Sequence, residues 1–198
     1  MPLTRALGLG LLLLTTAAAA PAKKAARACE VQTGTSPPTF QPNLNSPSAE
    51  DVVNAVTAWL NDVCTVDSFL NNPVGGPTAL DTVIAFAVDE PNHLKTLAAL
   101  PDLSQAGRDA AAALEANFPS IPANLDNLAS GAATAALATT AINFNRCCIV
   151  LPSIDTLVRE AAAVSGAFAD EEVPSPMFPD PCGAIDCSSG LSAGAASS

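Results

Sequence analysis

The sequence predicts an all-α protein, an antiparallel bundle of about five helices with disulfide-stapled extended N- and C-terminal segments. Apolar residues recur at three- and four-residue spacing in successive segments, which short Pro- or Gly-containing turns separate. No alternation of apolar and polar residues runs long enough to predict a strand. The abundant alanine suits helices that pack closely together.

The first 22 residues have the layout of a secretory signal peptide. Arg5 supplies the positive charge, an apolar run from Leu7 to Leu14 follows, and small residues then reach Ala22, after which we expect cleavage. The alternative, an uncleaved anchor, is weaker because a spanning helix needs about 20 apolar residues. We therefore expect a secreted protein without a transmembrane anchor, in which residues 23–47 form a Ser/Pro-rich leader segment.

The bundle domain is expected over residues 48–167. Ser48 and Asp51 approximate a capping box at the start of the first helix, which the turn after residue 72 ends. A second helix is expected from near Thr78, and Pro91 should stop or kink it before a short helical turn over 94–100. The apolar stripe of the first helix consists of Val52, Val56, Trp59, Leu60, Val63 and Leu70.

Three further helices complete the predicted bundle. The third covers 103–117, and a long fourth helix should run from Pro122 to a cysteine doublet near its end, where Pro152 breaks it. The fifth begins at Ser153 and is terminated by Gly166. Residues 168–198 are expected to form an acidic, Pro-rich, cysteine-containing tail.

The charge of the chain excludes one class of partner. Its formal net charge is −11, and basic residues are sparse beyond residue 30. Such a surface repels phosphate backbones, so nucleic acid is not an expected partner, and anionic membranes are disfavoured for the same reason.

An even number of cysteines in an exported chain predicts three disulfides. Six cysteines allow 15 pairings. We favour a Cys182–Cys187 bond, with Cys64 bonded to one member of the doublet and Cys29 to the other, because adjacent cysteines on a helix point in different directions. A zinc site is not predicted, since the paired Cys-x-x-Cys spacing is missing. The six cysteines are Cys29, Cys64, Cys147, Cys148, Cys182 and Cys187.

His93 is the only histidine and the only candidate for a general base. It follows Asp89 and Glu90 in a segment that we expect to be an exposed, solvated turn. The alternative is a secreted hydrolase that pairs His93 with a neighbouring carboxylate, although no Gly-x-Ser-x-Gly motif supports it. We predict no catalytic residue, no metal ligand and no cofactor.

The apolar interior offers the remaining candidate site. Helical bundles can hold a lipid chain between their helices, and the alternative is a filled core without a cavity. The candidate lining residues are Val56, Trp59, Leu60, Val63, Ile84, Leu137 and Leu157.

One resemblance bears on function. The Ala/Leu-rich signal peptide, the Ala-rich helices and the segments 142–148 and 151–155 resemble small secreted, effector-like proteins of filamentous fungi. Over residues 48–166 the chain is similar to hydrophobic-surface-binding proteins and cell-wall mannoproteins, and this resemblance implies a secreted helical bundle that binds a fatty acid or another apolar partner. We therefore expect a non-enzymatic binding or interaction protein with a lipid, an apolar surface, or a host or cell-wall protein as its partner. The alternative is a structural cell-wall protein without a ligand.

Overall fold

The computed structural model describes residues 31–39, 41–73 and 76–189. These residues form an all-α fold, as predicted. Part of the leader and the disulfide-bonded tail lie outside the helices as extended segments and short turns. The α-helices are α1 (Ala49–Asn71), α2 (Gly76–Ala98), α3 (Gln105–Asn117), α4 (Ser120–Ala129), α5 (Ala135–Asn145) and α6 (Leu151–Ser165).

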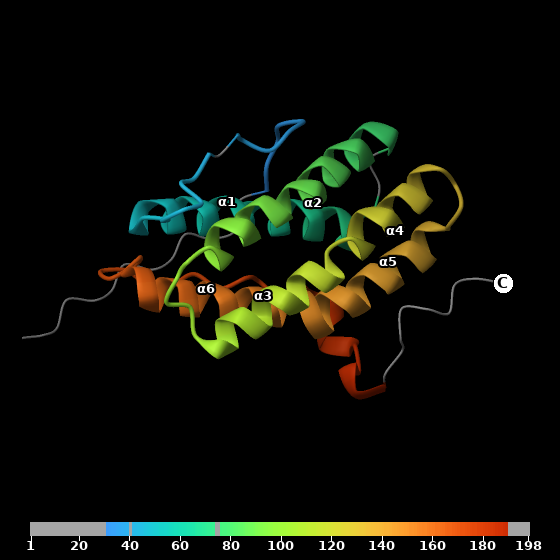
Figure 1. Cartoon of the computed structure of the whole chain (residues 1–198). Coiled ribbons are helices and arrows are strands. Elements are labelled where there is room, and N and C mark those ends of the chain that lie inside the picture. The colour runs from blue at the N-terminus through green and yellow to red at the C-terminus, as the bar shows by residue number, and fades with distance from the viewer. Residues whose placement is uncertain (1–30, 40, 74–75, 190–198) are drawn as a thin grey trace, which may run out of the picture.

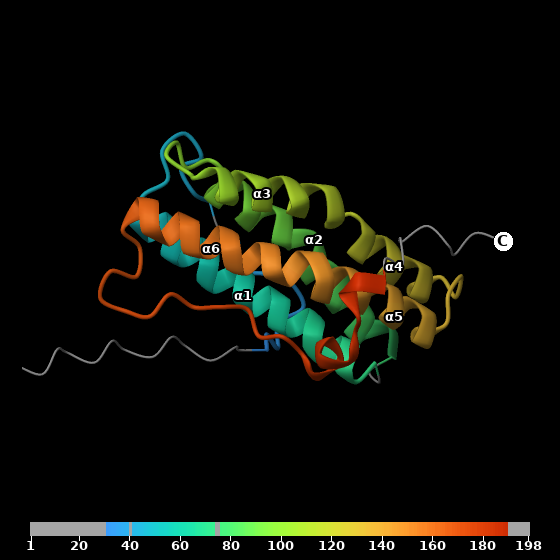
Figure 2. The same cartoon turned by 90° about the horizontal axis from the view of Figure 1, so that it is seen from below.

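The six α-helices of the described residues lie in four antiparallel rods (Figure 1). α1 and α2 each form one rod. α3 and α4 follow one another in the same direction and together form the third rod. α5 and α6 form the fourth, joined by a π-helical turn, η1 (Arg146–Val150). Neighbours in sequence are neighbours in space, and α6 returns beside α1 and closes the bundle (Figure 2).

The capping box predicted at the start of α1 is present. The Ser48 hydroxyl accepts a hydrogen bond from the Asp51 amide at 3.1 Å, and the Asp51 carboxylate accepts one from the Ser48 amide at 2.9 Å. These bonds satisfy backbone donors that the first helical turn leaves unpaired. They fix the start of a helix whose predicted apolar stripe is buried, except that Leu60 is only partly so.

The prediction that Pro91 could stop the second helix is wrong, because α2 runs through Pro91 to Ala98. A proline within a helix removes one backbone hydrogen bond and costs about 3 kcal/mol. Leu94 and Leu97, which lie beyond it, are buried in the core. Burial of two leucines contributes about 3–6 kcal/mol, enough to offset the cost of the proline.

The predicted fourth helix is also wrong, because it is two helices separated by a reversal of the chain. Gly131 has φ +74°, a left-handed conformation that glycine adopts without strain, and it lies between α4 and α5. Thr134 then caps α5 by accepting a hydrogen bond from the Leu137 amide. Pro152, expected to break the fourth helix, instead lies in the first turn of α6, where its missing N–H costs little.

Trp59 lies fully buried in the core, with its ring centroid 5.9 Å from that of Phe118. Buried aliphatic residues from α1, α2, α3, α4 and α6 pack into the same cluster, so all four rods share one interior. A side chain of α1 that faces α2 therefore lies in a water-poor environment.

The predicted Cys182–Cys187 bond is wrong. Cys147 bonds to Cys182 and Cys148 bonds to Cys187, so the doublet on η1 attaches two successive tail turns, η2 (Asp180–Ala184) and η3 (Cys187–Ser189). The prediction that the doublet bonds to Cys64 and Cys29 is therefore also wrong. Cys64 is also disulfide-bonded, but not to the doublet as predicted.

The segment between α6 and η2 runs back along the bundle to reach the doublet (Figure 2). Ser175 hydrogen-bonds Asp155 and Arg159 of α6, which holds this segment against the helix. Among the described residues, no helix combines the length and the apolar character needed to cross a membrane. The predicted signal peptide over 1–22 and Cys29 lie outside the described residues.

Candidate functional site

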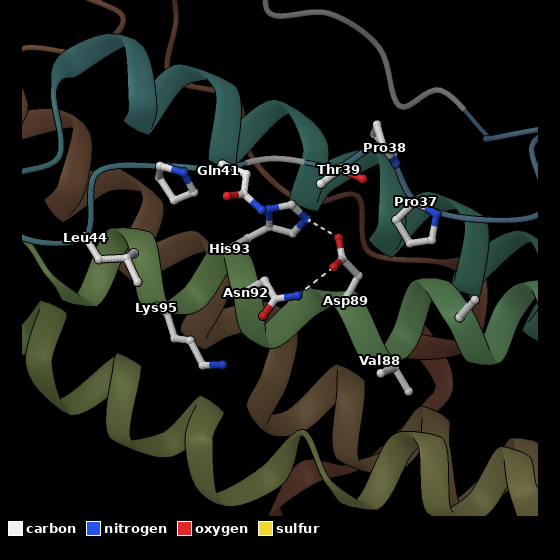
Figure 3. Close-up of a pocket in the computed structure, with 12 residues that line it drawn as sticks. Pro37, Pro38, Thr39, Gln41, Leu44, Val88, Asp89, Asn92, His93 and Lys95 are labelled. Atoms are coloured by element: carbon white, nitrogen blue, oxygen red, sulfur yellow. Dashed lines mark hydrogen bonds and ion pairs between the residues drawn. The ribbon is translucent and has the colours of Figure 1, made fainter.

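A pocket of about 540 Å³ lies between the end of the leader and α2 (Figure 3). We call it the leader pocket. Its wall combines apolar groups with polar and charged ones, and the leader crosses over the helix face that carries the charged groups. The lining residues are Pro37, Pro38, Thr39, Gln41, Pro42 and Leu44 of the leader, and Ala85, Val88, Asp89, Asn92, His93 and Lys95 of α2.

His93 and two carboxylates meet at the base of the leader pocket. The Nε2 atom of His93 lies 2.9 Å from Oδ2 of Asp62 and 3.2 Å from Oδ2 of Asp89. Asp89 and His93 are four residues apart on α2 and therefore share one helix face, whereas Asp62 reaches the same nitrogen from α1. Asn92 donates a hydrogen bond of 2.7 Å to Oδ1 of Asp89 and so orients that carboxylate.

The prediction of a solvated turn at His93 is wrong. The residue is 1% exposed and lies within α2. Because the helix continues through Pro91, His93 is carried onto the face that packs against α1 instead of into a loop. Its ring is 6.5 Å from Trp59, centroid to centroid, in a stacked arrangement.

Burial and charge act in opposite directions on this site. Burial lowers the pKa of His93, but the hydrogen bonds and charges of Asp62 and Asp89 outweigh it and raise the pKa to about 9. The hydrogen bond from His93 lowers the pKa of Asp89. Burial raises the pKa of Asp62, against the stabilising contact with His93. At neutral pH we therefore assign a charged His93 between two carboxylates.

A second buried charge cluster adjoins the first. The guanidinium of Arg146 contacts the carboxylate of Asp67 at 3.0 Å and that of Glu90 at 3.2 Å, and it donates to the Val63 carbonyl. Glu90 also accepts a hydrogen bond of 3.2 Å from the Trp59 indole. Both oxygens of Glu90 thus have donors, as a buried carboxylate requires.

Two polar atoms of the first cluster are left without partners among the described residues. Oδ1 of Asp62 and Nδ1 of His93 are both buried and make no hydrogen bond. A buried polar atom without a partner costs about 1–3 kcal/mol and calls for an explanation. One potential ligand atom from each of Asp62, Asp89 and His93 lies within 4.8 Å of the others, so these residues could hold a metal ion.

The residues predicted to line an apolar pocket do not line the leader pocket. Four of the seven are fully buried in the core, two are partly buried against it, and one is exposed. The prediction that Leu137 lines an interior pocket is wrong, because this residue is 67% exposed on the outer face of α5. The sequence pattern places α5 within a single long fourth helix. Val56, Trp59, Val63 and Leu157 are fully buried, and Leu60 and Ile84 pack partly buried against them.

Sequence reasoning missed Asp62, Asp67 and Arg146 as members of a site. A signal was present, because both aspartates lie within the helix that carries the apolar stripe. Asp62 is three residues after Trp59, and Arg146 sits between the apolar Ile142 and Val150. A charged residue placed on a buried helix face needs a charged partner, and such residues are candidates for a site.

Similarity to known proteins adds no second line of evidence. No protein-family model matches the chain, and neither a curated protein nor a solved structure matches it.

Proposed function

We propose that this chain is a secreted, non-enzymatic binding protein whose ligand occupies the leader pocket. The observation that carries the proposal is the pocket itself, at about 540 Å³ and with a mixed lining. Small-molecule sites are concave and mostly apolar, have a few placed polar groups, and range over about 300–1,000 Å³. The site therefore replaces the interior between the helices as the favoured place for a ligand.

Disulfide bonding supports the secreted location. Two bonds join η1 to the tail, and Cys64 is oxidised as well. Disulfides persist in oxidising compartments and are rare in the cytosol. This observation fits the signal peptide expected over residues 1–22.

The lining indicates the class of ligand. Pro37, Pro38 and Leu44 offer an apolar surface, whereas the carboxylate of Asp89 is 22% exposed and its pKa is lowered. A ligand with an apolar body and an ammonium or another hydrogen-bond donor fits this combination. A fatty acid, expected from the resemblance, could place its carboxylate beside Lys95 of the same lining but not beside Asp89, so both classes of ligand are tested.

The contacts of His93 favour binding over hydrolysis. Its Nε2 atom faces two carboxylates, and a ring that is charged at neutral pH is not a general base. A Ser-His-Asp mechanism needs the nucleophile within hydrogen-bond reach of the histidine. The hydrolase alternative is therefore less well supported.

The test uses mature protein collected from outside the cells, with two probes and a matched pair of variants. Dansylcadaverine carries an aromatic body and an ammonium group, and oleate carries an acyl chain and a carboxylate. Ala85→Trp fills the leader pocket, whereas Ala113→Trp makes the same change at a partly buried position of α3 that does not line it. Binding is followed by fluorescence for the amine and by native mass spectrometry for both.

We expect saturable binding of the amine that Ala85→Trp abolishes and Ala113→Trp preserves. Oleate uptake that Ala85→Trp blocks would keep the pocket but replace the amine by a lipid. Binding of neither probe, together with tight retention of the protein in a cell-wall fraction, would overturn the proposal in favour of the structural wall protein.

A further inference from the structure

We propose that Asp62, Asp89 and His93 form a binding site for one divalent transition-metal cation, of which Zn²⁺ is the best-suited example. Two carboxylate oxygens and one imidazole nitrogen, from α1 and α2, converge on the base of the leader pocket. Metal sites of helical bundles are built in this way, from side chains on facing helices.

The distances between the three atoms fit a shared ion. Tetrahedral Zn²⁺ with bonds of about 2.0 Å places its ligand atoms about 3.3 Å apart. The nitrogen of His93 lies 2.9 Å from the Asp62 oxygen and 3.2 Å from the Asp89 oxygen. Small movements of these side chains would admit the ion in place of the bridging proton.

The surrounding residues already orient one of the three ligands and pack beside a second. Asn92 holds Oδ1 of Asp89, which leaves Oδ2 directed at His93 (Figure 3). The Trp59 ring lies beside the imidazole, with ring centroids 6.5 Å apart and planes inclined by 29°. Such outer contacts commonly orient metal ligands and contribute to affinity.

The second observation that points to a cation is the unpartnered oxygen of Asp62. Asp62 is 1% exposed, and its Oδ1 atom makes no hydrogen bond with any residue that the structure describes, although Oδ2 of the same carboxylate faces His93. A carboxylate that binds a metal ion through both oxygens would satisfy this atom. A bound ion would give this oxygen a partner that the described residues do not supply.

The local charge balance also favours a cation. The two adjoining clusters contain four carboxylates, from Asp62, Asp67, Asp89 and Glu90, but only the cations Arg146 and His93. Two negative charges are left uncompensated when all six groups are ionised. One of these charges lies in the cluster of Asp62, Asp89 and His93, and a divalent ion that replaces the imidazole proton there would neutralise that cluster.

The ion class follows from the donors. Imidazole nitrogen with carboxylate oxygen suits Zn²⁺ and similar transition metals, whereas Ca²⁺ takes six to eight oxygen ligands. Asp89 and His93 line the leader pocket, which gives an ion a path of entry.

Because His93 is the only histidine in the chain, its ring gives a single, site-specific signal. The secreted protein is stripped with a chelator, dialysed and titrated with ZnCl₂, and the imidazole protons are followed by NMR while calorimetry gives the stoichiometry. We expect one equivalent of Zn²⁺ per chain, with the His93 signals shifting until that equivalent is reached. Asp89→Asn should weaken the Kd by at least about tenfold.

Asp155→Asn is the matched control, since Asp155 also pairs with a basic residue four positions later but lies outside the site. It should leave the Kd unchanged. Far-UV circular dichroism verifies that each variant is folded, and Asp89 is partly exposed, so its amide should be tolerated. Absence of saturable binding, binding that leaves the His93 signals unmoved, or equal affinity in Asp89→Asn would each overturn the inference.

The cation site does not depend on the proposed ligand of the leader pocket. Zn²⁺ binding is measured without either organic probe, and Ala85→Trp changes none of the three ligands. Failure of the metal titration would therefore leave the binding-protein proposal standing, and failure of probe binding would leave the cation site standing.

Discussion

The Nε1–H of Trp59 donates a hydrogen bond of 3.2 Å to Oε2 of Glu90, and both residues are fully buried. The residue that best marks the apolar face of α1 thus also anchors a carboxylate of α2. The other oxygen of Glu90 contacts Arg146, so the core and the charged clusters share one residue. Mutations in this region should therefore act through buried charge as well as through packing.

Trp59→Phe should lower the free energy of unfolding by about 1–3 kcal/mol beyond the loss of packing. The substitution leaves Oε2 of Glu90 buried without a donor, and an orphaned acceptor costs about that amount. Urea unfolding followed by circular dichroism measures the change. A double-mutant cycle with Glu90→Met, which removes the acceptor, separates the hydrogen bond from the packing, and simple additivity of the two changes would contradict the prediction.

Arg146→Met should destabilise the protein by about 3–5 kcal/mol, because it leaves Asp67 and Glu90 as buried charges without their partner. Arg159→Met is the control, since its ion pair with Asp155 is on the surface and exposed pairs contribute less than about 1 kcal/mol. Chemical denaturation compares the two variants under one set of conditions. Equal losses would show that the Arg146 cluster contributes no more than a surface pair.

The sequence predicts the helices better than it predicts their ends. The apolar spacing from Val52 to Leu70 defines the buried face of α1 because helical periodicity is a local property. The ends depend on packing that is not local. Pro91 is tolerated because residues beyond it are buried, whereas Gly131 permits a reversal that the apolar pattern alone does not reveal.

The candidate site could be predicted only in part. The sequence indicates His93 as a possible general base beside Asp89 or Glu90, but only as the alternative to a solvated turn. Asp62 is 31 residues from His93, and nothing in the spacing indicates that they meet. The continuation of α2 through Pro91 decides both the burial of His93 and its contact with α1. Because the sequence predicts a helix end or kink at Pro91, it also predicts an exposed His93.

The disulfide connectivity can be tested by counting thiols. The double variant Cys182→Ala/Cys187→Ala removes both tail partners of the doublet and should leave two free thiols, on Cys147 and Cys148. A Cys182–Cys187 bond would instead leave none. Alkylation of the denatured protein followed by mass spectrometry gives the count.

The matched pairs Cys147→Ala/Cys182→Ala and Cys148→Ala/Cys187→Ala should each leave no free thiol. Their bonds close segments with sequence separations of 35 and 39 residues, so in the chain-entropy model each contributes about 4 kcal/mol of stability. We expect both double variants to unfold at lower denaturant concentration by similar amounts. A free thiol in either variant would contradict the connectivity.

The buried His93 should make stability depend on pH in the neutral to alkaline range. Its pKa is raised to about 9 in the folded state from 6.5, so the folded protein retains a proton that the unfolded chain loses over this interval. The stabilisation is fully present below about pH 6.5 and is lost as the pH rises through about 9. The free energy of unfolding, measured with a chelator present, should therefore fall across this window.

His93→Gln provides the comparison, since glutamine carries no titrating proton and the difference between the two proteins isolates the histidine. The difference in unfolding free energy should shrink as the pH rises from 6.5 to 9 and should be flat below that range. In the wild type the single imidazole signal should titrate near pH 9 by NMR. Two ionised carboxylates at 2.9 and 3.2 Å must raise the proton affinity of the nitrogen that they face. Titration of His93 near pH 6.5, with parallel stability curves for the two proteins, would therefore show that Asp62 and Asp89 do not hold a charged ring between them.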